Sequence, residues 1–320
     1  MNQTNDTHEF ACLVGGKLEF NLALKRFKHE YTGKMFGHKN SRLNYLVSEG
    51  HQVYSKKYYT KNAEYQLTNI SEAYGKKLKH IMTADPYVSR KNIKNFDLPD
   101  TDVSISIGDW AEFIGWFLSE GCVSHYKDGH TAVSISQVKE VNPEKWENLS
   151  RLLLSLPFDF KHYERYFFDH RTRELHRYLE TLGTYANNKQ IPDYYFELPV
   201  SARMRLLKGL LAGDGRRKDP RNYEKHMIPF DQDTYTTSSE KLAKDVERLM
   251  IGLGFATSFN KYADSRQESY HDVYEIRMLD FTELLANPDN YYTAESDGHV
   301  YSVTVPGNKV LIRREGSWAH

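Results

Sequence analysis

Two carboxylates, Glu120 and Asp214, occupy the same position in two similar segments of the chain, residues 113–121 and 207–215. In each segment the acid closes an apolar run and is followed directly by a glycine. A carboxylate in the last turn of a helix meets the negative end of the helix dipole, and two such groups side by side repel each other. A divalent cation between them would remove both penalties. An oxygen-only site with open positions suits Mg²⁺, with Mn²⁺ as a substitute, and its chemistry would be hydrolysis of a metal-clamped phosphate.

The elements that must position these acids are two helices. Apolar residues of the first recur with the i, i+3, i+4 spacing of a helix; they are Trp110, Phe113, Ile114, Phe117 and Leu118. Each helix also has an interior glycine at the matched position, Gly115 or Gly209, at a cost of about 1 kcal/mol relative to alanine. This repeated cost predicts that the helices pack against each other at these glycines. Gly121 and Gly215 predict left-handed residues that end the helices. Two ordinary core helices with acid-glycine caps are the alternative.

The segments that follow the two helices share one order of elements. After the helix at 110–120 we expect strands near 122–126 and 131–137, a helix from 143, strands near 160–168 and a helix near 174–182. After the helix at 203–213 we expect a loop with residues 216–218, a strand near 233–238, a helix near 242–253, strands near 256–262 and 273–278 and a short helix near 281–286. The order predicts two αββαββα units within an α+β protein.

The paired helices resemble the two signature helices of the LAGLIDADG homing endonucleases, in the single-chain form with two repeats. The sequence Asn-Lys-Gln-Ile-Pro at 188–192 is similar to the Lys-x-Ile-Pro element that these proteins carry before the second signature helix. The resemblance covers residues 108–290, with repeat one at 108–190 and repeat two at 200–290. It implies a saddle of two pseudo-symmetric repeats whose open face takes double-stranded DNA. It also implies a monomer that makes a site-specific double-strand break in a long DNA target with Mg²⁺.

The resemblance also implies roles for individual residues. Glu120 and Asp214 would bind the Mg²⁺ ions; Glu120 departs from the usual aspartate, and a backbone ligand beside the acids stays open. Lys189 would polarise the attacking water or neutralise charge, with a solvated lysine before a turn as the alternative. Gln137 continues the inward phase of its strand, so we expect it near the acids as a water-shell residue, with a simple strand terminator as the alternative.

The second repeat lacks an obvious counterpart of Lys189, because no lysine occurs between Lys261 and Lys309. Arg277 or Lys261 would have to substitute. We therefore expect the two DNA strands to be cut at unequal rates.

Specificity would come from strand residues that face the major groove, where polar side chains read base edges and lysines contact phosphates. The expected DNA contacts are Ser134, Ser136, Lys161, Arg165, Arg216, Arg217, Lys218, Arg221, Thr236 and Lys261. For the basic run 216–218, a solvated charge cluster is the alternative.

The flanks, residues 1–100 and 293–320, resemble the two halves of an intein (Hint-type) splicing domain. The segment that ends at His51 is similar to the Thr-x-x-His block of that family, with Ser48 in place of threonine, and His320 resembles its penultimate histidine. Splicing needs a Cys or Ser as the first residue and an Asn as the last, whereas this chain has Met1 and His320. We therefore interpret the flanks as a degenerate or trimmed, mostly β splicing domain with the endonuclease inserted in it.

The amino-acid composition limits which other classes of protein this chain could belong to. The 320 residues are enough for two domains, and 43 basic residues balance 43 acidic ones, which counts mildly against a nucleic-acid binder but allows a basic face. The two cysteines, Cys12 and Cys122, argue against a disulfide scaffold, and we expect Cys12 to be a buried thiol. With no signal segment and no membrane-length apolar run, we expect a cytoplasmic protein of a prokaryotic or phage-infected cell.

The alternatives in function are a non-catalytic DNA-binding protein of the same fold, an RNA maturase and, third, a splicing protein.

Overall fold

The computed structural model describes residues 9–40, 43–81, 84–89, 91–127, 129–163, 166–169, 173–217, 229–263, 272–279, 283–314 and 317–319. The chain divides into two compact units. The first comprises Met1–Tyr87, Gly254–Ser258 and Leu279–His320, and the second comprises Val88–Leu253 and Phe259–Met278. The first unit is therefore built from both ends of the chain, and the second is inserted into its sequence. Among the described helices, none is long and apolar enough to cross a membrane.

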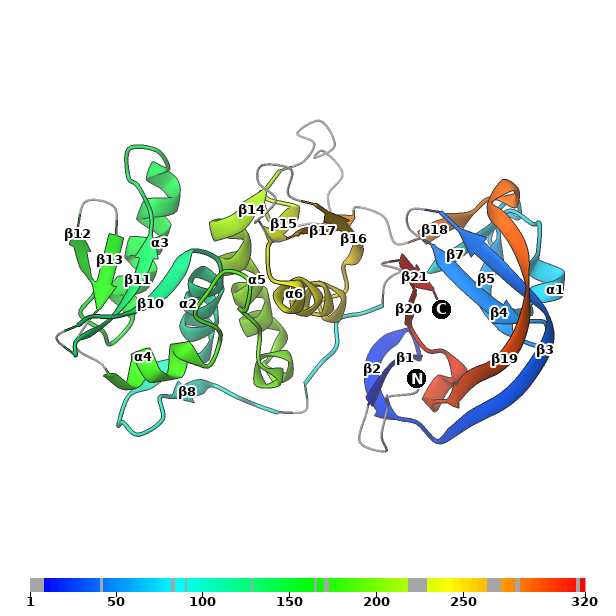
Figure 1. The fold of residues 1–320 in the computed structure, drawn as a ribbon, viewed down its shortest axis with the longest axis horizontal. Coiled ribbons are helices and arrows are strands. Elements are labelled where there is room, and N and C mark those ends of the chain that lie inside the picture. Colours follow the sequence, from blue (N-terminus) through cyan, green and yellow to red (C-terminus); the bar gives the residue numbers. More distant parts are fainter. Residues whose placement is uncertain are drawn as a thin grey trace. The chain divides into compact units, whose positions relative to one another are not determined.

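The second unit carries two successive runs of elements in one order (Figure 1). The first run is α2 (Ile107–Glu120), β10 (Gly121–His125), β11 (Thr131–Ser136), α3 (Pro143–Ser155), β12 (Lys161–Tyr163), β13 (Tyr166–Asp169) and α4 (Arg173–Glu180). The second is α5 (Val200–Asp214), β14 (Gly215–Arg216), β15 (Thr234–Thr237), α6 (Glu240–Gly252), β16 (Ala256–Tyr262) and β17 (Val273–Leu279). The two four-stranded sheets have the orders β10-β11-β13-β12 and β14-β15-β17-β16, which is one topology used twice. The predicted mixed α and β architecture is confirmed, and so is the predicted order of elements through β17, except that Gly215–Arg216 form β14 where we expected the start of a loop.

The short helix predicted near 281–286 is wrong. Residues 281–282 lie outside the described residues, and Glu283–Ala286 form β18, which pairs antiparallel with β7 (Leu78–Ile81) of the first unit. The physical reason is a period of two, because Leu284 and Ala286 are buried while their neighbours are not. A strand that inserts alternate side chains into a core outweighs the local helix preference of so short a segment.

Helices α2 and α5 pack backbone to backbone at the two glycines, as predicted. A Cβ on Gly115 would overlap the carbonyl oxygen of Leu206 and lie 2.7 Å from the backbone nitrogen of Leu210. A Cβ on Gly209 would lie 3.0 Å from the Cα of Gly115. Ion pairs also cross the helix pair, because Glu112 of α2 accepts from Arg205 at 2.9 Å and pairs with Lys208 at 2.8 Å.

The left-handed conformation predicted at the ends of these helices is wrong. Gly121 and Gly215 have φ of −87° and −79° with extended ψ, and each begins a strand with no intervening loop. Glycine is still required, because a Cβ at Gly121 would meet the carbonyl oxygen of Phe117 at 2.6 Å, and one at Gly215 would meet the Cα of Leu211 at 2.7 Å. The constraint is therefore steric crowding by the preceding helical turn rather than backbone handedness.

The second unit begins earlier than the predicted boundary at residue 100. A hairpin of β8 (Asn95–Asp97) and β9 (Ser104–Ser106) precedes α2. Phe96 of this hairpin stacks on Trp110 with ring centroids 4.3 Å apart, and Leu98 is buried. Residues 88–100 therefore belong to the second unit, with Phe96 and Leu98 in its core, and Leu279–Asn290 belong to the first.

The first unit is mostly β. Its further elements are β1 (Glu9–Val14), β2 (Lys17–Leu22), β3 (Lys25–Lys39), β4 (Asn44–Ser48), β5 (Gln52–Lys57), β6 (Gln66–Asn69), α1 (Ile70–Ala73), β19 (Tyr291–Thr304), β20 (Ile312–Arg314) and β21 (Ser317–Ala319). A long antiparallel ribbon joins β3 to β19, in register from Lys25 opposite Thr304 to His38 opposite Tyr291. The amide of Leu13 donates to the carbonyl of Lys309 at 3.1 Å, so described segments near both ends of the chain are hydrogen-bonded to each other.

Candidate active site at the ends of the paired helices

The last turns of α2 and α5 bring Glu120 and Asp214 together. Gly213 makes this possible, because a Cβ there would lie 3.0 Å from the hydroxyl of Ser119 and 3.1 Å from Cγ of Glu120. The Ser119 hydroxyl donates across the helix pair to the carbonyl of Leu210 at 3.0 Å. Small residues thus extend the close packing of Gly115 and Gly209 to the helix ends, where the acids stand.

Both acids are held in an environment that disfavours their charge. Burial raises the pKa of Glu120, and the nearby lysines Lys145 and Lys189 offset part of this effect. Burial, and then repulsion by Glu120, raise the pKa of Asp214 to about 7, against lowering by the same two lysines. By its surface area Asp214 is nevertheless an exposed residue, so its carboxylate has protein groups around it but stays accessible to a ligand.

Lys189 is buried beside the acids, with an exposed fraction of 4%. Its Nζ donates to the carbonyls of Phe117 at 3.1 Å, Ser119 at 3.5 Å and Gly121 at 2.8 Å. It therefore caps the C-terminal end of α2, where a cation is favoured by the helix dipole. Burial lowers its pKa to about 8, opposed by the charges of Asp214, Cys122 and Glu120. The alternative of a solvated lysine is excluded, because the side chain is buried and all three of its N–H donors have backbone acceptors.

The second repeat holds the backbone of Lys189 in place. Ser239, the N-cap of α6, donates its hydroxyl to the carbonyl of Lys189 at 2.7 Å and accepts from the amide of Leu242 at 3.1 Å. The amide of Ile191 donates to Asp245 at 3.0 Å. A lysine from the connection between the repeats is thus fixed by α6 while its ammonium group reaches the end of α2.

Lys145 is the residue that sequence reasoning missed. Its Nζ donates to the carbonyl of Gly213 at 2.8 Å, and its charge lowers the pKa of both acids. It caps the end of α5 as Lys189 caps that of α2. Its position at the third residue of α3 is a signal that could have found it, because a lysine in the first turn of a helix opposes the dipole and so suggests another reason for its presence.

The structure places Gln137 against Glu120, as the phase of its strand predicted. Its Nε2 donates to Glu120 Oε1 at 3.4 Å, and the side chain is buried. Its Oε1 is buried without a hydrogen-bond partner in the described part of the chain. A buried oxygen without a hydrogen bond destabilises the folded state, so the Oε1 atom of Gln137 is available to a further donor or to a cation beside Glu120.

A divalent cation fits this donor set. The carboxylates of Glu120 and Asp214 and the orphaned oxygen of Gln137 are all oxygen ligands, which Mg²⁺ prefers. A cation would also remove the repulsion that raises the pKa of Asp214. The backbone carbonyls of Ser119 and Gly213 accept from Lys189 and Lys145, and each carbonyl oxygen has a second lone pair, so a backbone ligand at these positions stays an open prediction.

The residues expected to contact DNA from the first sheet lie on one face of it. Ser134 pairs with Cys122, while Val133 and Ile135 turn to the other face and are buried. Ser134 is itself buried and lies 2.9 Å from the Cys122 sulfur, whereas Ser136 and Lys161 are half-buried. Arg165 lies outside the described residues.

In the second sheet, cross-strand ion pairs involve the expected contacts. Arg216 pairs with Glu275, and the Arg217 side chain donates to the carbonyl of Asp231 at 2.9 Å. Thr236 stands opposite Glu275, and its hydroxyl is buried without a hydrogen-bond partner among the described residues. Lys218 and Arg221 lie outside the described residues.

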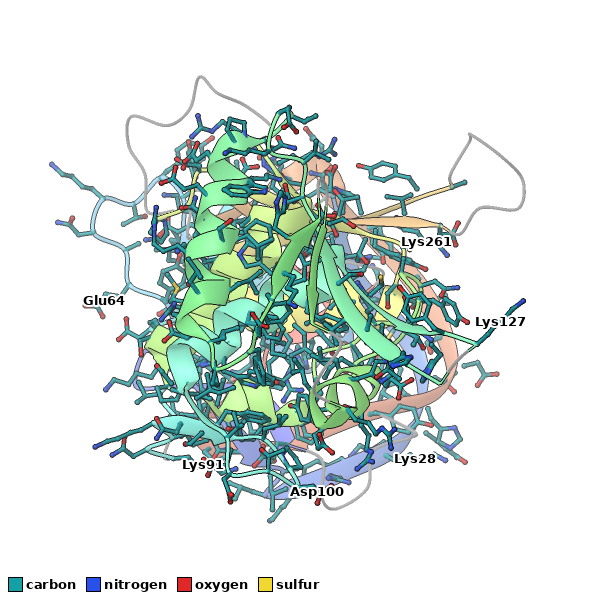
Figure 2. All side chains as sticks on the ribbon, turned by 90° about the vertical axis from the view of Figure 1, so that its left-hand side faces the viewer. Lys28, Glu64, Lys91, Asp100, Lys127 and Lys261 are labelled. Carbon is teal, nitrogen blue, oxygen red and sulfur yellow. The ribbon has the colours of Figure 1, made fainter. Side chains whose placement is uncertain are left out.

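Neither proposed counterpart of Lys189 in the second repeat affects the acids. Lys261, labelled in Figure 2, is exposed near the end of β16 and pairs with Asp272 at 2.7 Å. Arg277 pairs with Asp233 at 3.5 Å. The second cation of the site is Lys145 instead. The site therefore has two lysines, although we expected it to have Lys189 without a counterpart.

In the first unit, the residues that resemble splicing positions are partly described. His51 follows β4, and burial lowers its pKa. His320 lies outside the described residues. Cys12 is fully buried, as expected, its thiol donates to the carbonyl of Phe10 at 3.1 Å, and burial raises its pKa to about 11.

Comparisons with known proteins find several similar sequences. No family model matches the chain. It is 24% identical over 312 residues to an ATP-dependent Clp protease proteolytic subunit of Chlamydomonas moewusii, covering 88% of this chain and 29% of that protein. It is 21% identical over 373 residues to a DNA-directed RNA polymerase subunit beta C-terminal section of Stigeoclonium helveticum, covering 99% and 34%. It is 32% identical over 95 residues to the replicative DNA helicase DnaB of Synechocystis, covering 29% and 10%. The chain thus spans about a third or less of these curated relatives.

Two solved structures are similar to part of the chain. Mesophilic variants of the homing endonuclease I-DmoI match at 15% identity and a TM-score of 0.36, covering 54% of this chain and 84% of that one. The homing endonuclease I-WcaI bound to its DNA recognition sequence matches at 12% identity and a TM-score of 0.35, covering 56% and 83%. At these TM-scores the function has to be argued from the residues of the site.

Proposed function

We propose that the second unit is a metal-dependent phosphodiesterase that acts on DNA. The observation that carries this is the acid pair, Glu120 and Asp214, held together at the ends of α2 and α5 although burial, and then repulsion by Glu120, raise the pKa of Asp214 to about 7. Such strain is found where a bound ligand relieves it. Two lysines lie beside the pair, as an anionic substrate requires.

Within that class, we assign the chain to the LAGLIDADG homing endonucleases. Support comes from the signature pair, from the shared strand order of the two sheets and from Lys189 in its Lys-x-Ile-Pro element. Under this proposal the two runs are related by approximate two-fold symmetry. Their sheets form a saddle that takes double-stranded DNA, and the chain acts as a monomer.

The division of labour among the side chains follows from their contacts. Glu120 and Asp214 bind the cation, which when present polarises a phosphate oxygen and activates water. Lys189 has all three donors on carbonyls, so it neutralises charge and holds the helix end rather than polarising water. Lys145 has a single hydrogen bond among the described residues, to Gly213, and is the better residue to orient the attacking water. Gln137 completes that shell with its free oxygen.

The insertion of this unit into the first one supports a mobile element. Proteins named as a protease subunit, a polymerase subunit and a helicase all share similarity with a chain that spans about a third or less of their length. The protease and polymerase subunits match over most of this chain and the helicase over 95 residues, and we do not expect a segment shared by proteins with such different names to be the source of their activities. The first unit, in which described segments near both ends of the chain are hydrogen-bonded to each other, would be the Hint-like carrier, with the buried Cys12 arguing against a displaced splicing nucleophile.

The decisive test is cleavage of duplex DNA that joins the sequences flanking the coding insertion, with Mg²⁺ or Mn²⁺ and with EDTA as control. Wild type should cut both strands, and Asp214→Asn should bind without cutting. Binding without cutting by wild type would favour the non-catalytic regulator, and binding only to structured RNA would favour the maturase. Full cutting by Asp214→Asn would refute the assigned site.

Nicking rates on a supercoiled plasmid that carries the same target would test strand preference. Each helix end has one lysine, but Lys145 has N–H donors left for substrate or water whereas Lys189 has none. This difference is the structural basis for unequal cleavage rates of the two strands. Equal rates in wild type would remove strand asymmetry from the proposal without affecting the assignment of the acids.

A further inference from the structure

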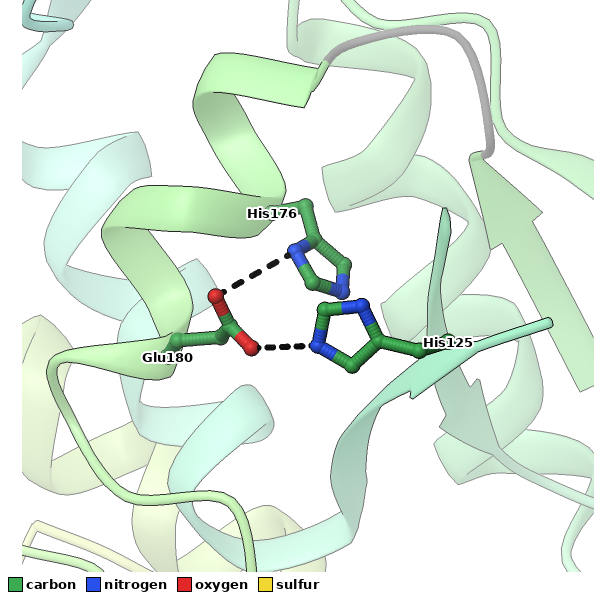
Figure 3. Close-up of side chains that lie close together, drawn as sticks. All are labelled: His125, His176 and Glu180. Carbon is green, nitrogen blue, oxygen red and sulfur yellow. Dashed lines mark hydrogen bonds and ion pairs between the residues drawn. The ribbon is translucent and has the colours of Figure 1, made fainter. Parts of the chain in front are cut away.

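Three side chains of the second unit, outside the acid pair, form another group of metal-ligating type. His125 ends β10, and His176 and Glu180 lie one turn apart on α4 (Figure 3). His125 Nε2 lies 2.6 Å from Glu180 Oε1, and His176 Nδ1 lies 3.6 Å from Glu180 Oε2. One ligand atom from each residue lies within 4.8 Å of the other two.

The backbone dictates this grouping. His125 stands opposite Thr131, and Val123 stands opposite Val133, so His125 shares the helix-covered face of the sheet because residues two apart in a strand point the same way. Helix α4 packs against β10 and β11, and the i, i+4 spacing of His176 and Glu180 puts both on one side of it. The three ligands are therefore supplied by two packed elements and not by one flexible loop.

A second observation points to a ligand. His176 is buried with 3% of its surface exposed, and its Nε2 has no hydrogen-bond partner among the described residues. The rings of His176 and His125 meet edge to face at 4.6 Å. The Glu180 carboxylate thus lies between two imidazole rings, and one ring nitrogen of the group has no hydrogen bond. Buried polar atoms usually have a partner, so this nitrogen is free to take a ligand. His125 is 63% exposed and Glu180 34%, which leaves a path for an ion from solvent.

We infer that His125, His176 and Glu180 bind one Zn²⁺ or a similar late first-row transition-metal ion. Two imidazole nitrogens and one carboxylate oxygen with an open fourth position are a common zinc donor set, at bond lengths of about 2.0–2.2 Å. Tetrahedral ligand atoms are then about 3.3 Å apart, so the exposed His125 ring has only to withdraw slightly from Glu180. Imidazole donors do not suit Mg²⁺, so this site and the acid pair would select different ions. The bound ion would tie the end of β10 to α4.

The test is a Co²⁺ titration of the full chain at pH 7.5, with any affinity tag removed and visible absorption as the readout. We expect one equivalent to bind with the intense bands of a four-coordinate site, to be displaced by Zn²⁺ and to be unaffected by millimolar Mg²⁺. Zn²⁺ should also raise the thermal midpoint of the second unit.

Matched variants locate the ion. His125→Gln changes an exposed side chain and should weaken Co²⁺ binding at least tenfold, as should Glu180→Gln. His130→Gln, an exposed histidine close in sequence, should bind as wild type does, and Asp214→Asn should also retain the Co²⁺ site, which separates this proposal from the nuclease site. Absence of stoichiometric binding, or unchanged binding by both His125→Gln and Glu180→Gln, would overturn the inference.

Discussion

Asp214→Asn should make the protein more stable in the absence of metal. The pKa of Asp214 is raised from its usual 3.8 to about 7, so the ionised form is disfavoured in the folded state. Each pKa unit corresponds to 1.36 kcal/mol, which gives about 4 kcal/mol as an upper bound. Because the side chain is partly exposed, solvent screening reduces this to about 1–2 kcal/mol. Asparagine has nearly the same shape and no charge, so it should recover that amount.

The pH dependence of this gain follows from linkage. A carboxyl whose folded pKa is raised binds more protons in the folded state than in the unfolded one, so its contribution to stability is present at low pH and is lost as pH rises from about 4 to about 7. Above both pKa values the loss is complete and constant. The advantage of Asp214→Asn should therefore be full at pH 7.5 and mostly absent at pH 4.5.

The assay is urea unfolding at both pH values, in EDTA and in Mg²⁺, with fluorescence from the tryptophans of the second unit. Glu147→Gln is the matched control, because Glu147 is an exposed carboxylate of α3 paired with Arg151 and should change stability by under about 0.5 kcal/mol. Mg²⁺ at a hundred times its Kd should stabilise wild type by about 2.7 kcal/mol and Asp214→Asn far less. A variant less stable than wild type at pH 7.5, or an equal response to Mg²⁺, would refute the reasoning.

Three further outcomes follow from the same contacts. Gly115→Ala should destabilise the second unit by about 3 kcal/mol in urea unfolding, because the new Cβ would meet the backbone of α5. The control Gly298→Ala should be nearly neutral, because its Cβ would meet nothing within 4 Å. Equal effects of the two substitutions would exclude packing of the helices at Gly115. Lys145→Met should mainly lower the rate constant for DNA cleavage, with little loss of stability. Lys189→Met should lower the free energy of unfolding by about 2 kcal/mol, because it leaves buried carbonyls without a donor. If parallel cleavage and unfolding measurements gave the reverse result, Lys189 would be the catalytic lysine and Lys145 the structural one. Each lysine variant should also raise the pH midpoint of Mg²⁺ binding, measured calorimetrically, because both lysines lower the pKa of the acids; an unchanged midpoint would show that they do not act on the acids.

The sequence predicted those parts of the site that depend on local spacing. The matched positions of the acids and of Gly115 and Gly209 identified the helix pair, and the alternation along β11 placed Gln137 beside Glu120. For Lys145 the local signal is limited to its unfavourable place in the first turn of α3; its partner Gly213 is 68 residues away, and no local pattern connects the two residues. The assignment at 283–286 failed for the same reason, since β18 is a strand only because β7 pairs with it.

The two lysines make the acid pair a property of both repeats together. Lys145 comes from the first run of elements and caps α5, the helix of the second run. Lys189 precedes α5, is held by Ser239 at the start of α6, and caps α2, the helix of the first run. The end of α5 thus takes its cation from the first run, and the lysine at the end of α2 is held in place by the second. A change in the packing of α2 against α5 would separate the carboxylates and break both caps at once.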